Sequence, residues 1–147
     1  MQVLLVEDAL PFRDFVARAL QHCPIALQIV CEVSDGLEAI ERAQDLQPDL
    51  VVLDIGLPRL NGIEAARAIR ERSPRSKILF LSQESNPDIV QDALGTGAEG
   101  YVHKMAAGRD LIPALNTIFQ GKRFVSRSAR QHPEFPLWDE ELCETAV

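Results

Sequence analysis

Residues 50–54 read Leu-Val-Val-Leu-Asp, four apolar residues followed directly by a carboxylate. A short run that is apolar at every position is typical of a strand buried on both faces of a parallel sheet. Similar runs occupy residues 3–6, 26–33, 77–81 and 100–102. The sequence therefore predicts a buried sheet, with Asp54 at the end of one of its strands.

The segments between these runs have helical spacing, with apolar residues recurring every three or four positions. Helices are predicted over residues 11–22, 37–46, 62–72, 87–95 and about 110–121. Asn61 with Glu64 resembles a capping box, and Asn86-Pro87 is an N-cap followed by proline at the first helical position. Because proline deep in a helix removes a hydrogen bond, Pro113 predicts that the last helix starts near Asp110, or is kinked if it starts earlier.

Five strands alternating with five helices predict an α/β fold, a doubly wound five-stranded parallel sheet of the flavodoxin-like order 2-1-3-4-5. A length of 147 residues fits one domain. The alternation stops after Val125, so we expect a domain over residues 1–126 and an acidic C-terminal tail over 127–147. Residues 136–142 of that tail have the pattern of one short helix.

The composition excludes several classes of protein. A net charge of -7 without a basic patch argues against DNA contact by this chain. No apolar run reaches the ~20 residues of a membrane span, and no signal peptide precedes the first strand. Three cysteines are odd in number and lack metal-ligand spacing, so we expect reduced thiols and a cytoplasmic protein.

Polar side chains follow the predicted strands. Glu7 and Asp8 follow the first, Asp54 the third, Ser82 the fourth and Lys104 the fifth. Ligands of open α/β sheets bind beyond the carboxyl ends of the strands, where these side chains converge. Crowded carboxylates need a proton or a cation, and oxygen ligands favour Mg²⁺. A carboxylate can also accept a phosphoryl group, whose oxygens a lysine and a hydroxyl can bind.

The sequence resembles the response-regulator receiver domain of two-component signalling, which has the CheY-like fold. The resemblance covers about residues 2–125, and its motifs lie at 3–8, 53–58 with Asn61-Gly62, Leu81-Ser82 and 97–104. The stretches 35–39 and 121–126 are similar to the LuxR-type subfamily of transcriptional response regulators.

The resemblance implies a role for each acidic residue. Asp54 would be the phosphoacceptor, and Lys104 would pair with it or with its phosphoryl group. Asp8, Asp54 and the backbone carbonyl of Gly56 would bind Mg²⁺ or Mn²⁺ directly, whereas Glu7 would act through water. The chain would then be a switch that catalyses only its own phosphorylation and dephosphorylation, and not a conventional enzyme.

The resemblance also implies how the switch works. Ser82 would bond a phosphoryl oxygen and shift, and Tyr101 would turn inward when Ser82 moves. The output surface would be the fourth helix, fifth strand and fifth helix. The partner would be a sensor histidine kinase or a phosphotransfer protein, and the first and fifth helices would support a homodimer.

Some residues depart from the family pattern, and other functions stay open. Ala9, Gln83 and Glu84 stand where the family often has other residue types, so we expect a changed phosphoryl lifetime or kinase choice. One alternative is the receiver portion of a LuxR-type DNA-binding regulator whose helix-turn-helix domain is absent from this chain. An Asp-nucleophile phosphatase is disfavoured, because Gly56 stands where a second aspartate is needed. A scaffold that is never phosphorylated is a further alternative.

Overall fold

A computed structural model of the chain describes residues 1–127. The predicted acidic tail, with its short helix over 136–142 and Cys143, lies outside the described residues apart from Arg127. The predicted domain boundary at residue 126 therefore stays a prediction. In the described part, no helix is both long enough and apolar enough to cross a membrane.

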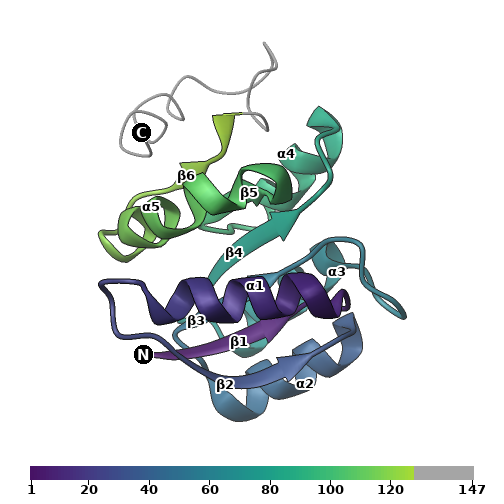
Figure 1. Cartoon of the computed structure of the whole chain (residues 1–147). Coiled ribbons are helices and arrows are strands. Elements are labelled where there is room, and N and C mark those ends of the chain that lie inside the picture. The colour runs from purple at the N-terminus through teal and green to yellow at the C-terminus, as the bar shows by residue number, and fades with distance from the viewer. Residues whose placement is uncertain (128–147) are drawn as a thin grey trace.

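The predicted α/β architecture is confirmed (Figure 1). The parallel strands are β1 (Gln2–Val6), β2 (Gln28–Val33), β3 (Leu50–Leu53), β4 (Lys77–Ser82), β5 (Gly100–His103) and β6 (Phe124–Val125), in the order β2-β1-β3-β4-β5-β6. The helices are α1 (Leu10–Gln21), α2 (Gly36–Leu46), α3 (Gly62–Arg72), α4 (Pro87–Gly95), the short 3-10 helix η1 (Lys104–Ala106) and α5 (Ala107–Phe119).

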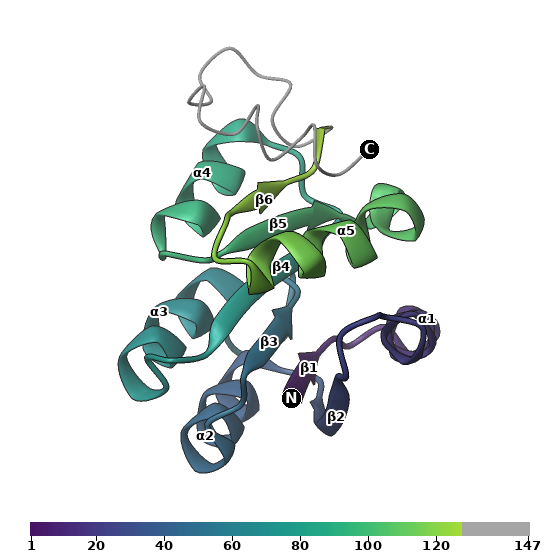
Figure 2. The same ribbon diagram turned by 90° about the vertical axis from the view of Figure 1, so that its left-hand side faces the viewer.

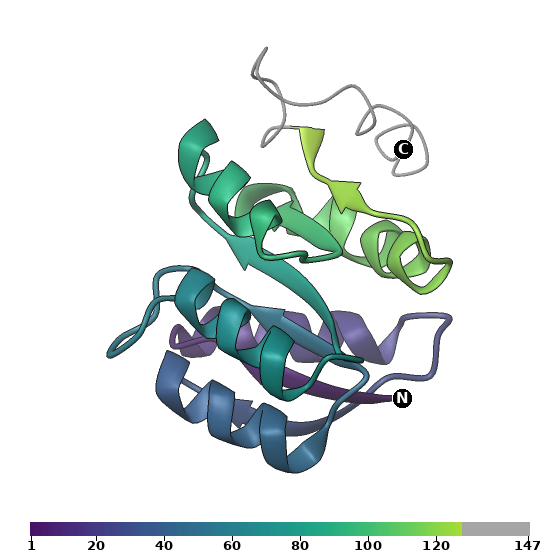
Figure 3. The same ribbon diagram turned by 180° about the vertical axis from the view of Figure 1, so that it is seen from behind.

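Helices cover both faces of the sheet. Figure 2 shows α2, α3 and α4 on one face and α1 and α5 on the other, and Figure 3 shows the first face from the front. Successive side chains of a strand point to opposite faces, so Leu4 and Val6 pack in the core beside α2–α4. Val3 and Leu5 pack in the core beside α1 and α5. Burial on both faces explains why these strands are apolar at every position.

The register of the strands aligns their carboxyl ends. Val6 lies opposite Leu53, and Leu53 lies opposite Phe80. The main-chain N–H of Asp54 continues this ladder, donating to the Val6 carbonyl over 3.2 Å. As a result the residues that follow β1 and β3 come out side by side at one edge of the sheet.

The predicted helix caps are present. The Asn61 side chain accepts hydrogen bonds from the N–H groups of Ile63 and Glu64 at the start of α3. The Asn86 side chain caps α4 in the same way, with Pro87 as the first helical residue. Each cap satisfies backbone donors that the first helical turn leaves unpaired.

Of the two alternatives predicted for the last helix, the start near Asp110 is wrong, and the kink expected for an earlier start stays a prediction. The helix α5 begins at Ala107, continues directly from η1 and contains Pro113. A proline inside a helix costs about 3 kcal/mol, but each fully buried leucine contributes about 1.5–3 kcal/mol. Leu111 and Leu115 are both buried against the sheet, so tertiary packing outweighs the local penalty. The Asp110 side chain accepts a hydrogen bond from Ser126 and does not act as an N-cap.

The strand β6 was not predicted. It pairs with β5 through two residues, Phe124 and Val125, which is shorter than the four to eight residues on which a periodicity argument rests. The N–H of Phe124 donates to the Glu99 carbonyl and that of Ser126 to the Tyr101 carbonyl. The chain is therefore fixed to the free edge of β5 as far as Ser126.

Replacement of Gly62 should destabilise the fold. A Cβ on Gly62 would lie 1.9 Å from the Asp54 carbonyl oxygen, so the start of α3 or the end of β3 has to move. We expect G62A to lower the free energy of unfolding by about 1–3 kcal/mol in urea titrations. G108A is the matched control, because a Cβ there meets nothing within 4 Å. Equal stability of the two variants would contradict this packing.

The N-cap of α2 should give a pH-dependent contribution. The Asp35 carboxylate accepts from the Glu38 N–H and pairs with Arg59, and both contacts lower the pKa of Asp35. Because the pKa of Asp35 is lower in the folded protein than in the unfolded chain, the charged side chain stabilises the fold above the unfolded pKa of about 4. This stability is lost as the pH falls through the folded pKa. D35A should therefore cost about 1 kcal/mol at pH 7 and less at pH 2.

D35N is the control for this prediction. Asparagine also caps helices but carries no titrating carboxyl, so D35N should keep most of the cap at every pH. A cost of D35A that does not change between pH 7 and pH 2 in chemical denaturation would contradict the role of the charge.

Candidate functional site

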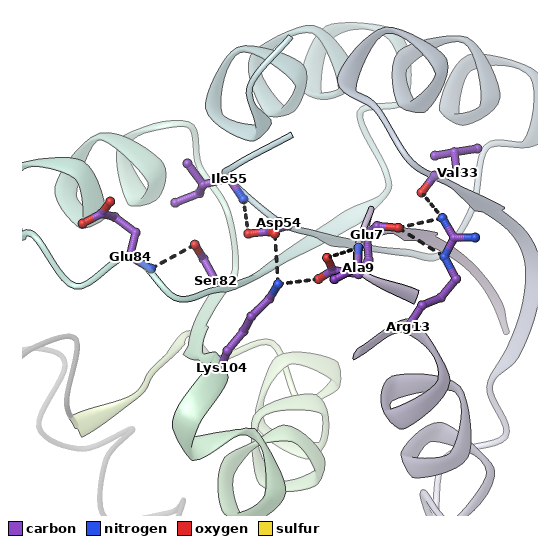
Figure 4. A network of polar contacts seen from close by, with 9 residues as sticks. All are labelled: Glu7, Ala9, Arg13, Val33, Asp54, Ile55, Ser82, Glu84 and Lys104. Carbon is purple, nitrogen blue, oxygen red and sulfur yellow. Dashed lines mark hydrogen bonds and ion pairs between the residues drawn. The ribbon is translucent and has the colours of Figure 1, made fainter. Parts of the chain in front are cut away.

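The ammonium group of Lys104 lies between two carboxylates at the carboxyl edge of the sheet (Figure 4). Its Nζ is 2.7 Å from Oε1 of Glu7 and 3.0 Å from Oδ2 of Asp54. Glu7 follows β1, Asp54 follows β3 and Lys104 follows β5. All three side chains are at most 10% exposed, so they are the charged centre of this edge.

Glu7 is held in place by its own main chain and by Arg13. Its Oε2 accepts from the Ala9 N–H over 3.0 Å. Its carbonyl oxygen accepts from Nη2 of Arg13 at 2.6 Å and from Nε at 3.1 Å, and Nη2 also donates to the Val33 carbonyl (Figure 4). The guanidinium of α1 thus ties the end of β1 to the end of β2.

The Asp54 side chain is fixed in orientation. Its Oδ1 accepts from the Ile55 N–H over 2.7 Å, while its Oδ2 faces Lys104. Behind it, the N–H of Gly62 donates to the Ile55 carbonyl over 2.8 Å. The start of α3 therefore supports the loop that carries the carboxylate.

The pKa values of Lys104 and Glu7 are both raised, but by different dominant causes. Burial by itself would lower the pKa of Lys104, but its hydrogen bonds with Glu7 and Asp54 outweigh burial and the pKa is raised. For Glu7, burial dominates and raises the pKa, although Lys104 and the Ala9 N–H oppose it. Two oxygens within 3.0 Å of one nitrogen favour a charged lysine, so we assign the proton to Lys104.

Phe12 of α1 also contacts the lysine. The Lys104 Nζ lies 4.7 Å from the centre of the Phe12 ring, within the range of a cation–π contact. Phe12 packs on the core beside α1 and α5, so α1 contributes one aromatic contact to the lysine of the ion pair.

The three acidic side chains form a cluster that fits a hard cation. Glu7, Asp8 and Asp54 each offer a carboxylate oxygen, and these oxygens lie within 4.8 Å of one another. Asp8 is exposed, whereas Glu7 and Asp54 are buried. Only oxygen donors meet here, which is the ligand set of Mg²⁺.

An open cleft lies beside this cluster and has a volume of about 380 Å³, more than ten times the ~30 Å³ of a water molecule. It is lined by Asp8, Ala9, Asp54, Ile55, Gly56, Ser82, Gln83, Glu84 and Lys104. Five of the predicted site residues, Asp8, Asp54, Gly56, Ser82 and Lys104, thus line one cleft, whereas the buried Glu7 is not part of its lining. The cleft has room for a tetrahedral anion with its water.

Ser82 and Tyr101 meet at the loop between β4 and α4. The Ser82 Oγ accepts from the Glu84 N–H over 3.1 Å, and the Tyr101 hydroxyl donates to the Glu84 carbonyl. Tyr101 is fully buried and points inward, next to Phe80. Burial raises the pKa of the Tyr101 hydroxyl well above its ordinary value, so this hydroxyl stays a hydrogen-bond donor. The predicted movement of Tyr101 with Ser82 stays a prediction.

Sequence reasoning did not identify Arg13, Phe12 or His103 as parts of the site. Arg13 lies one helical turn after Ala9, which brings its side chain back toward the end of β1. Its short distance from Glu7 along the chain was the available signal. His103 lies two positions after Tyr101 along β5 and therefore points to the same face of the sheet. For Phe12 the sequence offers no signal beyond an ordinary core position.

The comparisons with known proteins agree with this geometry. The family model of the response regulator receiver domain matches residues 3–116. The transcriptional regulatory protein DegU of Brevibacillus brevis is 34% identical over 125 residues, which are 85% of this chain and 52% of DegU. The chain thus spans about half the length of this relative.

Two solved structures extend the similarity over nearly the whole chain. A LuxR-family two-component response regulator from Aurantimonas sp. SI85-9A1 is 29% identical, with a TM-score of 0.78 over 97% of this chain and 95% of that one. The isolated receiver domain of RcsB from Salmonella enterica serovar Typhimurium, determined with the phosphomimetic BeF3-, is 25% identical. Its TM-score is 0.82 over 89% of this chain and 96% of that one.

Removal of the lysine charge should destabilise the site in a pH-dependent way. The hydrogen bond from Lys104 lowers the pKa of Glu7 and so opposes the effect of burial. In K104M this bond is absent, so the pKa of Glu7 should rise further. A raised folded pKa gives stability that is present at low pH and is lost as the pH rises through it. We expect K104M to cost about 2 kcal/mol at pH 8 and less at pH 5, since an open cleft leaves the carboxylates partly hydrated.

K122M is the control for this variant, because Lys122 is exposed. It should change the free energy of unfolding by less than about 0.5 kcal/mol at either pH. A K104M cost that is the same at pH 5 and pH 8 in urea denaturation would show that Glu7 does not take up the proton.

Proposed function

The chain belongs to the response regulator receiver domain family, and from this premise we propose that it is a phosphorylatable signalling switch. A receiver is a phosphoacceptor and differs in this from a conventional enzyme. We propose Asp54 as the acceptor, with a sensor histidine kinase or a phosphotransfer protein as donor. The observation that supports this most directly is Asp54 itself, which lines the cleft with one oxygen bonded to Lys104.

In the proposed reaction, a carboxylate oxygen of Asp54 attacks the phosphorus of a phosphohistidine. The new O–P bond forms as the P–N bond breaks, and the histidine ring leaves with the electron pair and takes up a proton. Lys104 then stabilises the negative phosphoryl oxygens, because its ammonium is already beside the acceptor carboxylate. The Ser82 hydroxyl lines the same cleft and can donate to one of these oxygens.

The residues fit a divalent cation, Mg²⁺ or Mn²⁺. Asp8, Asp54 and Gly56 line the cleft. The carboxylates of Asp8 and Asp54 and the main-chain carbonyl of Gly56 are proposed as the direct ligands. Both oxygens of Glu7 already accept hydrogen bonds, from Lys104 and from Ala9, which supports contact through water. The cation supplies charge neutralisation between the carboxylates and the incoming phosphoryl group.

The proposed switch runs through the loop between β4 and α4. A phosphoryl group on Asp54 offers Ser82 a strong acceptor, and a shift of Ser82 changes its contact with the Glu84 N–H. Tyr101 bonds the Glu84 carbonyl of the same loop. The change would therefore reach the surface of α4, β5 and α5, which we propose as the output face.

A second candidate is the receiver portion of a LuxR-type DNA-binding regulator. It is favoured by the coverage, because the chain spans about half of DegU, whose name describes a transcriptional regulator. A helix-turn-helix domain would then lie outside this sequence. A homodimer through α1 and α5 fits the same candidate, and Leu10 and Phe15 of α1 are exposed apolar side chains.

The proposal is tested by intact-mass spectrometry after incubation with acetyl phosphate. We expect one phosphoryl adduct that requires Mg²⁺, because the donor and the cluster are both anionic. The adduct should be absent from D54N and present in D14N, which changes an exposed aspartate of α1. An adduct that persists in D54N would reject Asp54 as the acceptor.

Absence of any adduct in the unmodified protein would be followed by titration with beryllofluoride and Mg²⁺, monitored by NMR. No adduct and no beryllofluoride complex together would leave the scaffold reading, in which the acidic cluster is only structural.

A further inference from the structure

Two side chains of β5 hold the loop between β4 and α4 through hydrogen bonds. Tyr101 donates its hydroxyl to the Glu84 carbonyl, and His103 contacts the Gln83 carbonyl with its Nε2 over 3.0 Å. The two residues are two positions apart along β5, so both point to the face of the sheet that carries α4. Two consecutive carbonyls of the cleft wall are thus held by one strand.

The hydrogen bonds around the ring define the tautomer of His103. Its Nδ1 faces the Met105 N–H at 3.3 Å, and an N–H can only donate, so Nδ1 accepts. The proton of the neutral ring is then on Nε2, which donates to the Gln83 carbonyl, a group that can only accept. Each ring nitrogen has the partner that this tautomer requires.

The main chain of His103 is fixed as well. Its N–H donates to the Ser126 Oγ over 3.1 Å, and this hydroxyl donates to Oδ2 of Asp110 over 2.8 Å. Ser126 is 0% exposed and Asp110 is 3% exposed, so this chain of hydrogen bonds is shielded from water. The ring therefore projects from a rigid position where β5, β6 and α5 meet.

We propose that His103 is a positioning residue for the phosphoryl chemistry of the cleft, an inference that rests on the proposed function. His103 directly precedes Lys104, and through the Gln83 carbonyl it holds the residue directly after Ser82. The β4–β5 ladder already places Ser82 opposite His103, and the His103 side chain adds a hold on the next residue of the loop. This side chain thus helps to fix the separation between the lysine and the hydroxyl that bind the phosphoryl oxygens. Nothing requires His103 to touch the phosphoryl group itself.

A purely structural histidine differs from a positioning residue in what its loss changes. Loss of a structural hydrogen bond lowers the free energy of unfolding and leaves the reaction rate per folded molecule unchanged. Loss of a positioning bond frees the loop and slows the reaction, because the Ser82 and Lys104 groups are no longer held at a fixed separation. The rate per folded molecule therefore separates the two roles.

The experiment compares H103F with H103Q in the full chain. Phenylalanine keeps a ring but has no donor, whereas the glutamine amide can donate to the Gln83 carbonyl. The rate of adduct formation with acetyl phosphate and Mg²⁺ is measured by intact mass, at a temperature where thermal unfolding shows every variant to be folded. H22F is the matched control, because His22 is exposed at the end of α1.

We expect H103F to be phosphorylated about five-fold more slowly, the effect of about one neutral hydrogen bond, with recovery to within about two-fold in H103Q. H22F should match the unmodified protein. Long-range ¹H–¹⁵N correlation spectra should show the His103 ring protonated at Nε2. Unchanged rates in folded H103F, an equal loss in H103Q and H103F, or a proton on Nδ1 would each overturn the inference.

The two proposals fail in different ways. If the unmodified protein forms neither an adduct nor a beryllofluoride complex, the proposed function fails and the role of His103 falls with it. If the unmodified protein forms the adduct and folded H103F forms it equally fast, only the role of His103 is rejected.

Discussion

The site depends on a single ammonium group placed between two buried carboxylates. Two like charges about 4 Å apart repel by about 4 kcal/mol at an effective dielectric constant of 20, so Glu7 and Asp54 need a cation between them. Lys104 supplies it at 2.7 and 3.0 Å. In the proposed function, the same charge would favour the arrival of a phosphoryl group on Asp54, which makes the centre more negative. The stability of the site and the proposed reactivity of Asp54 would then have one physical origin.

This arrangement is possible only because parallel strands end at one edge. The order β2-β1-β3-β4-β5-β6 places β1 and β4 on either side of β3, and β5 next to β4. Asp54 therefore has Glu7 on one side and Ser82 on the other. Lys104 comes from two strands away, and its long side chain crosses the end of β4 to reach Asp54. A shorter cationic side chain at that position could not make this contact.

The cleft combines a rigid wall with an adjustable one. Asp54 is backed by Gly62, whose position admits no Cβ, and Glu7 is fixed through its carbonyl by Arg13. The wall formed by Gln83 and Glu84 instead has contacts from side chains to its backbone, including those of Tyr101 and His103. Such bonds can be exchanged one at a time, whereas a strand ladder cannot. A loop of this kind suits the proposed switch, in which it would respond to a new charge on Asp54.

The sequence alone determined the first five strands and their order, the caps at Asn61 and Asn86 and the convergence of Asp8, Asp54, Ser82 and Lys104. Periodicity and capping are local, and the polar residues follow strands whose ends must meet. Only the tertiary structure decided that α5 runs through Pro113, that Phe124 and Val125 form β6, and that Arg13, Phe12 and His103 support the site. Burial of Leu111 and Leu115 outweighs the cost of a helical proline, and a two-residue strand exists only because β5 has a free edge. Most of these contacts, such as Phe12 with Lys104 and His103 with Gln83, join residues far apart in the chain, so their energies cannot be read from any local pattern. Arg13 and Glu7 are only six residues apart, and their contact depends on how α1 lies against the end of β1.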